Sequence, residues 1–93
     1  MQTKICRVVG QTDPIEVPSK KTLSGTTKKS TVRLRELGGD YEDEYCCTLF
    51  GKLAETQYPI GRTVSVALRF STHENNGAFY QDIVANDVIV LER

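Results

Sequence analysis

A strand-like segment in the middle of the chain ends at a glycine and leads directly into a short helix-forming stretch. In residues 44–50, Tyr45, Cys47 and Leu49 alternate with Glu44, Cys46, Thr48 and Phe50, and this period of two predicts a half-buried β-strand. Gly51 supplies a turn, and the residues that follow favour a single helical turn to about Gln57. The chain is therefore restricted to folds in which a short helix joins two strands.

Further strands flank this segment and are separated by glycine and proline residues. We expect strands over residues 4–9, 30–37, 62–72 and 79–91, with residues 15–17 as a short resumption of the first. Residues 18–30 are rich in Ser, Thr and Lys and predict a mobile loop, whereas Asn75-Asn76-Gly77 predicts a hairpin turn. Five strands with a helix between the third and fourth predict an all-β, five-stranded Greek-key barrel of the OB-fold type, as a single domain over residues 1–93.

Composition excludes several classes of protein. The longest apolar runs fall far short of the roughly 18 residues of a membrane helix, and no secretory signal follows Met1, so we expect a cytoplasmic protein that does not bind membranes. The three cysteines form no Cys-x-x-Cys pair and His73 is the single histidine, so we expect neither a disulfide nor a metal site. A chain of 93 residues buries a modest core, which makes self-association plausible.

Charge is balanced overall but unevenly distributed. Twelve basic and twelve acidic residues cancel, yet half of the basic ones fall within one short stretch, namely Lys20, Lys21, Lys28, Lys29, Arg33 and Arg35. An acidic block follows, made of Asp40, Glu42, Asp43 and Glu44. Two interpretations stay open: one side of the fold is locally positive, or two solvated segments of opposite sign keep the protein soluble.

The alternation also predicts which side chains face solvent. In the strand over residues 30–37, Val32 and Leu34 take the apolar side, so Arg33 and Arg35 take the other. Phe50 shares its parity with polar side chains and is expected on or beside the outer surface. The aromatic ring and the two guanidinium groups are therefore predicted to project together from adjacent strands.

Several motifs carry a resemblance to a known family. Val8-Val9-Gly10 is followed closely by Asp13-Pro14-Ile15-Glu16-Val17, and Phe50-Gly51-Lys52-Leu53-Ala54-Glu55 is followed by Tyr58 and by Gly61-Arg62-Thr63-Val64-Ser65-Val66. In this order and spacing the chain resembles bacterial and phage single-stranded DNA-binding proteins of the OB-fold type. Small uncharacterised OB-fold domains related to that family share much of the pattern.

The resemblance implies sequence-nonspecific binding of single-stranded DNA, with RNA as a second ligand, in replication, recombination or repair. It also implies assembly into dimers or tetramers. Residues 18–30 and 71–79 would flank the binding face, bases would stack on Phe50 first and on Tyr80 and Phe79 next, and cations would contact phosphates. Core packing is the competing role of each aromatic, and we expect it for Phe79, Phe70 and Tyr45. The cations are Arg33, Arg35, Arg69, Lys20, Lys21, Lys28 and Lys29.

Departures from the family pattern qualify these expectations. The chain has no tryptophan, and Glu44 stands six residues before Phe50, where the family often has an aromatic residue. Because each stacked base contributes roughly 1–3 kcal/mol, we expect weaker binding. The acidic C-terminal tail through which the family recruits partners is also missing after Arg93, so recruitment by that route is not expected.

Two other classes of function compete with nucleic-acid binding. An OB-fold module for protein interaction or oligomerisation, without significant nucleic-acid binding, is favoured by the zero net charge and the acidic block. An enzyme is not expected, because no nucleophile and base, paired carboxylates or glycine-rich phosphate loop can be proposed. We expect no cofactor.

Overall fold

Strands make up most of the described part of the chain, which comprises residues 1–39 and 41–91 of a computed structural model. In chain order the elements are β1 (Gln2–Gln11), β2 (Ile15–Pro18), β3 (Thr26–Glu36), β4 (Glu44–Phe50), α1 (Lys52–Glu55), β5 (Thr63–Asn75) and β6 (Ala78–Val90). The only helix in these two ranges is α1, which has four residues and is therefore too short to cross a membrane.

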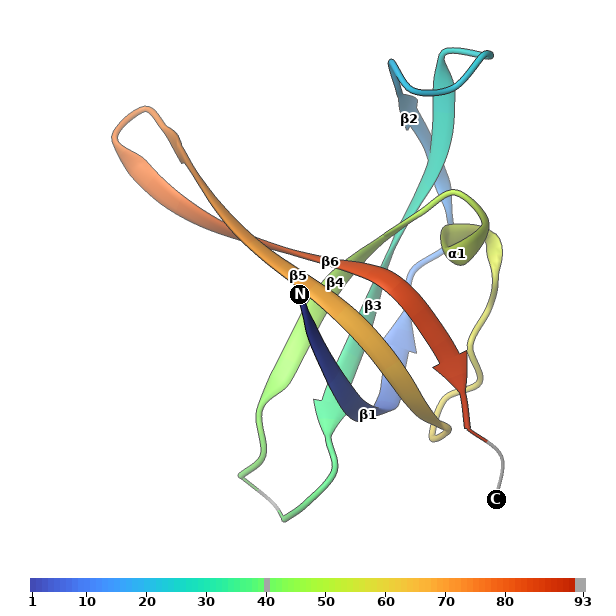
Figure 1. The fold of residues 1–93 in the computed structure, drawn as a ribbon, viewed down its shortest axis with the longest axis vertical. Helices are drawn as coiled ribbons and strands as arrows, with labels where there is room; N and C mark the ends of the chain where they lie inside the picture. Colours follow the sequence, from blue (N-terminus) through green and yellow to red (C-terminus); the bar gives the residue numbers. More distant parts are fainter. Residues whose placement is uncertain (40, 92–93) are drawn as a thin grey trace.

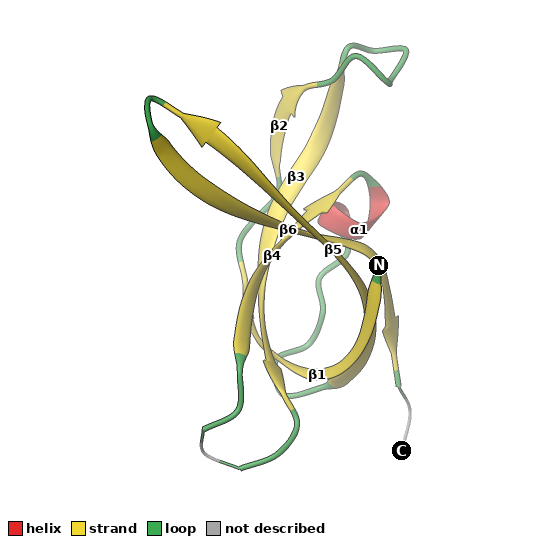
Figure 2. Ribbon diagram, turned by 60° about the vertical axis from the view of Figure 1, so that its left-hand side comes forward, coloured by secondary structure: helices red, strands yellow, loops and turns green. Residues whose placement is uncertain are grey.

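Five of the strands close into a barrel. β1 pairs antiparallel with both β5 and β3, so that Cys6 lies opposite Val64 on one side and Glu36 on the other. The circuit continues from β5 to β6, from β6 to β4 through a parallel contact of Thr48 with Val84, and from β4 back to β3. Figure 2 shows these strands curving around a ring, with α1 beside β3 and β4. The predicted barrel, with a helix between its third and fourth strands, is confirmed.

The core fills the barrel with the side chains that the alternation predicts. Val32 and Leu34 of β3 and Cys47 and Leu49 of β4 are buried, and α1 contributes Ala54, whose carbonyl oxygen accepts a hydrogen bond of 3.2 Å from the buried Ser30 hydroxyl. The remaining buried apolar residues are Cys6, Val8, Tyr58, Val64, Val66, Leu68 and Ala85. Residues of opposite parity on β3 and β4 consequently lie on the outer surface.

Two hairpin arms extend from one end of the barrel and diverge (Figure 1). The β2–β3 arm consists of β2, residues 19–25 and the first four residues of β3, held by the pairing of residues 15–18 with residues 26–29. The β5–β6 arm comprises residues 71–82, all of them exposed. Its turn has positive φ at Asn76 (53°) and Gly77 (79°), as a type I′ hairpin turn requires, which confirms the turn predicted there.

Several predicted boundaries were wrong. β1 is longer at both ends than the strand predicted over residues 4–9, and β5 extends to Asn75, so most of the loop expected over residues 71–79 is paired strand. The loop expected over residues 18–30 is confined to residues 19–25, because residues 26–29 find hydrogen-bonding partners on β2 and join β3. The helical turn ends at Glu55 instead of Gln57, because Thr56 already adopts an extended conformation. The correction at residues 26–29 affects function, since Lys28 and Lys29 lie on a paired strand instead of a loop.

Candidate nucleic-acid interface

The outer face of β3 and β4 carries the side chains for which the sequence predicts a binding role. Register places Lys29 opposite Phe50, Thr31 opposite Thr48 and Arg33 opposite Cys46. All six have the parity that points away from the core, and Phe50 is 44% exposed. Phe50 and Arg33 therefore lie on the outer surface as predicted, and Arg35 shares their parity but is partly buried. The arginines do not lie beside the ring, however, because the register places Lys29 opposite Phe50 and leaves Arg33 and Arg35 four and six residues farther along β3.

Phe50 forms one wall of a groove at the base of the β2–β3 arm. Gly51 continues this wall, and the arm supplies Pro18, Lys21 and Thr27 on the other side of a space of about 420 Å³. Gly51 has φ +64°, a left-handed conformation that favours glycine and turns the chain from β4 into α1. The groove therefore combines an exposed aromatic surface with a lysine ammonium group.

Arg33, farther along β3, is engaged by a carboxylate. Its Nε donates to Glu44 Oε1 at 2.7 Å, and the two side chains are 55% and 37% exposed. This hydrogen bond and the charge of Glu44 raise the pKa of the guanidinium group. Arg35 lies two residues on and its Nη2 donates to the Gly39 carbonyl oxygen at 3.3 Å. A phosphate at Arg33 would have to share or displace Glu44.

A row of outward side chains connects β3 to the other arm. Thr31 lies beside Thr48, Thr48 beside Val84, and Val84 beside Arg69 on β5. Arg69 thus shares the outer face, two strands away from β4. Farther out on the β5–β6 arm, Tyr80 has the same parity and is 49% exposed.

Tyr80 is stacked on His73, its register partner, with ring centroids 5.3 Å apart and an interplanar angle of 20°. His73 Nδ1 lies 2.9 Å from Asp82 Oδ2, so the imidazole is held from two sides. Sequence reasoning missed His73, although its position across the Asn-Gly turn from Tyr80 was a usable signal. One face of the Tyr80 ring is therefore covered by the imidazole.

The remaining predicted residues are distributed unevenly. Lys20 and Lys21 are exposed in the loop of the β2–β3 arm, and Lys21 reaches the groove of Phe50. Lys28 has the opposite parity from Lys29, and its Nζ lies 3.8 Å from Glu16 Oε1. Lys28 therefore does not share the outer face of β3 and β4.

Among the aromatics expected in the core, one prediction was wrong. Tyr45 and Phe70 pack edge to face against the core, with centroids 6.2 Å apart, as expected. Phe79 is 82% exposed, because the β5–β6 arm extends past the barrel and neither of its faces is covered. Phe79 is thus available at the tip of the arm.

Comparison with known proteins identifies the architecture. No family model matches the sequence, and no curated protein matches it either. Among solved structures, the chain is similar to the second OB-fold domain of replication protein A from Methanococcus maripaludis, with a TM-score of 0.67 and 16% identity over 98% of this chain and 83% of that one. This protein has an OB fold. At such low identity the likeness extends to the fold alone.

The OB fold gives the surface features a common geometry. OB-folds bind oligonucleotides and oligosaccharides on the face of their second and third strands, between the loop joining strands 1 and 2 and the loop joining strands 4 and 5. Here those strands are β3 and β4, and the two loops are the β2–β3 arm and the β5–β6 arm. Phe50, Lys29 and Arg33 thus occupy the face that OB-folds use.

Proposed function

We propose that this protein binds single-stranded nucleic acid, DNA in the first place, with little sequence preference. The observation that carries the proposal is the half-exposed ring of Phe50 beside Lys29 and Lys21, on the OB-fold face between the arms. Every base has a π-face that can stack on an aromatic ring, and cations along the groove can hold the backbone. This combination needs no base-specific hydrogen bond.

The path of the strand follows from the positions of cations and rings. A base stacked on Phe50 would place neighbouring phosphates near Lys21 and Lys29. The row of threonines leads from there toward Arg69, and Tyr80 offers a second ring on the β5–β6 arm. Contacts from both arms would enclose the strand.

Moderate affinity is part of the proposal. Glu44 compensates Arg33, and Glu16 lies beside Lys28, so fewer cations are available for phosphates than the sequence suggests. The chain also has no tryptophan and a formal net charge of zero. Binding would therefore depend on stacking more than on net electrostatic attraction, and RNA would be accepted as well as DNA.

The proposal includes a role in replication, recombination or repair, in the cytoplasm and without catalysis. The similar fold of a domain from a replication protein supports it at the level of the architecture. Self-association into a dimer or tetramer would add avidity along a strand. Its support is a row on the outer face of β1, β5 and β6, where Ile5, Ser65 and Ile89 lie side by side and both isoleucines are exposed.

An interaction module that binds proteins and no nucleic acid is the second candidate, because the same exposed isoleucines could contact another protein. The two functions differ in salt dependence. The anisotropy of fluorescent oligo-dT would be measured at two salt concentrations, with duplex DNA and oligo-U as further ligands. Neutralised phosphates make log affinity fall with log salt by about 0.7 per contact on single strands.

Lys29→Gln tests the cationic part, with Arg62→Gln as a matched control in the turn before β5. We expect Lys29→Gln to reduce the salt slope by about 0.7 and Arg62→Gln to leave it unchanged. Absence of oligo-dT binding at about 100 μM protein in low salt, the weak end of nonspecific binding, would favour the interaction module.

A further inference from the structure

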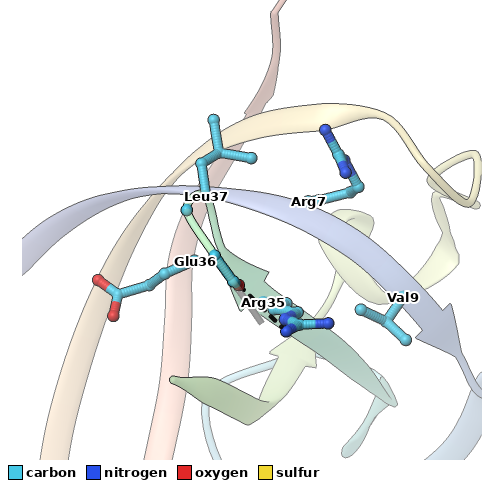
Figure 3. A pocket seen from close by; sticks show the side chains of 7 residues that line it. Arg7, Val9, Arg35, Glu36 and Leu37 are labelled. Carbon is cyan, nitrogen blue, oxygen red and sulfur yellow. Dashed lines mark hydrogen bonds between the residues drawn. The ribbon is translucent and has the colours of Figure 1, made fainter. Parts of the chain in front are cut away.

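The two ends of the barrel offer different surfaces to a partner. At the end away from the arms, Arg7, Arg35 and Leu37 line a pocket of about 400 Å³ beside the turn after β3 (Figure 3). Arg35 is already engaged there, because it donates to the Gly39 carbonyl oxygen at 3.3 Å and lies opposite Glu44 on β4. The two arms at the other end carry large apolar side chains that are exposed at their tips.

The β5–β6 arm presents an aromatic ring on a face that suits a protein better than a nucleic acid. Phe79 is 82% exposed and has the opposite parity from Tyr80, so its ring projects from the other side of the arm. Its register partner is Glu74, which places a carboxylate on the same face. Residues 70–92 contain no lysine or arginine. A phosphate backbone is therefore disfavoured on this side of the arm, called here the Phe79 face.

The β5–β6 arm is a two-stranded ribbon beyond the barrel. β1 pairs with β5 no farther than Leu68, and β4 pairs with β6 at Val84. In the described part of the chain, residues 71–82 therefore pair only with one another. A two-stranded hairpin on its own is marginally stable in water. A partner that covered the Phe79 face would stabilise the arm.

The tip of the β2–β3 arm is complementary to the Phe79 face in charge and in polarity. Leu23 is fully exposed in its loop, and Lys20 is exposed three residues earlier. The loop is held in shape by the Ser19 amide, which donates to the Gly25 carbonyl oxygen at 2.8 Å. Among the described residues, no ion pair engages Lys20 or Glu74. Each tip thus combines one apolar side chain with one charge, and the two charges are opposite.

These complementary tips diverge from the same end of the barrel, so they do not meet within one chain (Figures 1 and 2). We propose that two copies of the protein associate end to end through their arms. The Phe79 face of each copy contacts the β2–β3 loop of the other, with Phe79 against Leu23 and Glu74 beside Lys20. A two-fold axis perpendicular to the plane of the arms forms both contacts at once, because each arm then meets the unlike arm of the partner.

This contact deepens the self-association that belongs to the proposed function, and it rests on that function only for its role along a strand. It lies away from the exposed isoleucines of β1 and β6. Tyr80 is on the opposite side of its arm, and the groove of Phe50 is at the base of the other arm, so both stay open to a strand.

Sedimentation velocity over a series of protein concentrations tests the dimer. We expect Phe79→Ala and Leu23→Ala each to raise the dimer dissociation constant by at least about tenfold, since every contact loses a large apolar side chain. Both residues are exposed, so the variants should fold, which urea denaturation checks. Tyr41→Ala is the matched control, because Tyr41 is 97% exposed at the opposite end of the barrel, and it should leave the constant unchanged.

Charge reversal tests the pairing of the two tips. Lys20→Glu would bring two carboxylates together and Glu74→Lys would bring two cations together, so each variant alone should be monomeric at concentrations where the wild type dimerises. An equal mixture of the two variants should form a dimer, because every contact then joins opposite charges. A mixture that stays monomeric under these conditions would overturn the arrangement.

Other results would overturn the proposal as a whole. One is a wild-type protein that stays monomeric at its highest soluble concentration. Another is a dimer that survives Phe79→Ala and is lost in Ile89→Ser, which would place the contact on the exposed isoleucines. A third is monomeric Phe79→Ala protein that loses as much affinity for oligo-dT as Phe50→Ala, which would make the ring a nucleic-acid contact. Failure of the proposed function would appear differently, as a dimer with all the expected responses and no binding of oligo-dT.

Discussion

Truncation of the exposed ring at position 50 is the sharpest perturbation of the candidate interface. Phe50→Ala removes the aromatic wall of the groove and leaves the backbone of β4 paired with β3. One stacked base contributes roughly 1–3 kcal/mol, and every 1.4 kcal/mol is about tenfold in affinity. We therefore expect Phe50→Ala to weaken oligo-dT binding by about 5-fold to 150-fold.

Stability should respond much less than affinity. A fully buried Phe→Ala change costs about 3–5 kcal/mol, but the Phe50 ring is 44% exposed and lies outside the core cluster. The cost should therefore stay well below that range, and the variant should remain folded at the assay temperature. Phe50→Tyr keeps the ring and should retain most of the affinity.

The assay is the anisotropy of fluorescent oligo-dT at low salt, accompanied by urea denaturation of each variant. Tyr41→Ala is the matched control, because Tyr41 is 97% exposed in the turn between β3 and β4. The reasoning would be refuted by a folded Phe50→Ala protein that binds oligo-dT within twofold of the wild type. It would also be refuted if Tyr41→Ala weakened binding as strongly.

Three further predictions follow from the same surface and core. Glu44→Gln should release Arg33 for a phosphate, strengthening oligo-dT binding and increasing the salt slope by about 0.7; weaker binding would contradict this. His73→Ala should weaken oligo-dT binding by removing the support of the Tyr80 ring, and an affinity equal to the wild type would show that the stack is irrelevant. Burial raises the pKa of Cys47 from 9.0 to about 12. Because the thiol loses its proton more easily in the unfolded chain, the free energy of unfolding should keep its full value below pH 9 and decline as the pH rises toward 12. Urea denaturation across this range should show a shallower decline for Cys47→Ala, and an equal decline would exclude the thiol as its cause.

The side of the sheet on which each residue lies was predictable from the sequence. Side chains alternate with a period of two, so the burial of Val32 and Leu34 places Arg33 on the opposite face without any knowledge of the fold. The same local rule placed Phe50 outside, and the positive φ of an Asn-Gly pair marked the hairpin turn. Such features depend only on neighbours along the chain.

Contacts between distant segments were decided by the tertiary structure. Residues 26–29 looked like a loop because their partner strand is recognised only once β2 folds back on them. Phe79 looked like a core residue because nothing in its own segment shows that the β5–β6 arm passes beyond the barrel.

The charged residues show the same difference between local features and contacts between distant segments. The sequence determined that Arg33 and Arg35 share the face opposite to the buried Val32 and Leu34. Closure of β1 onto β3 then placed Arg7 beside Arg35, and pairing of β3 with β4 placed Glu44 within reach of Arg33. Orientation on a strand is a local property of the backbone, whereas the partner of a charged group depends on strand register, which forms only when the whole barrel closes.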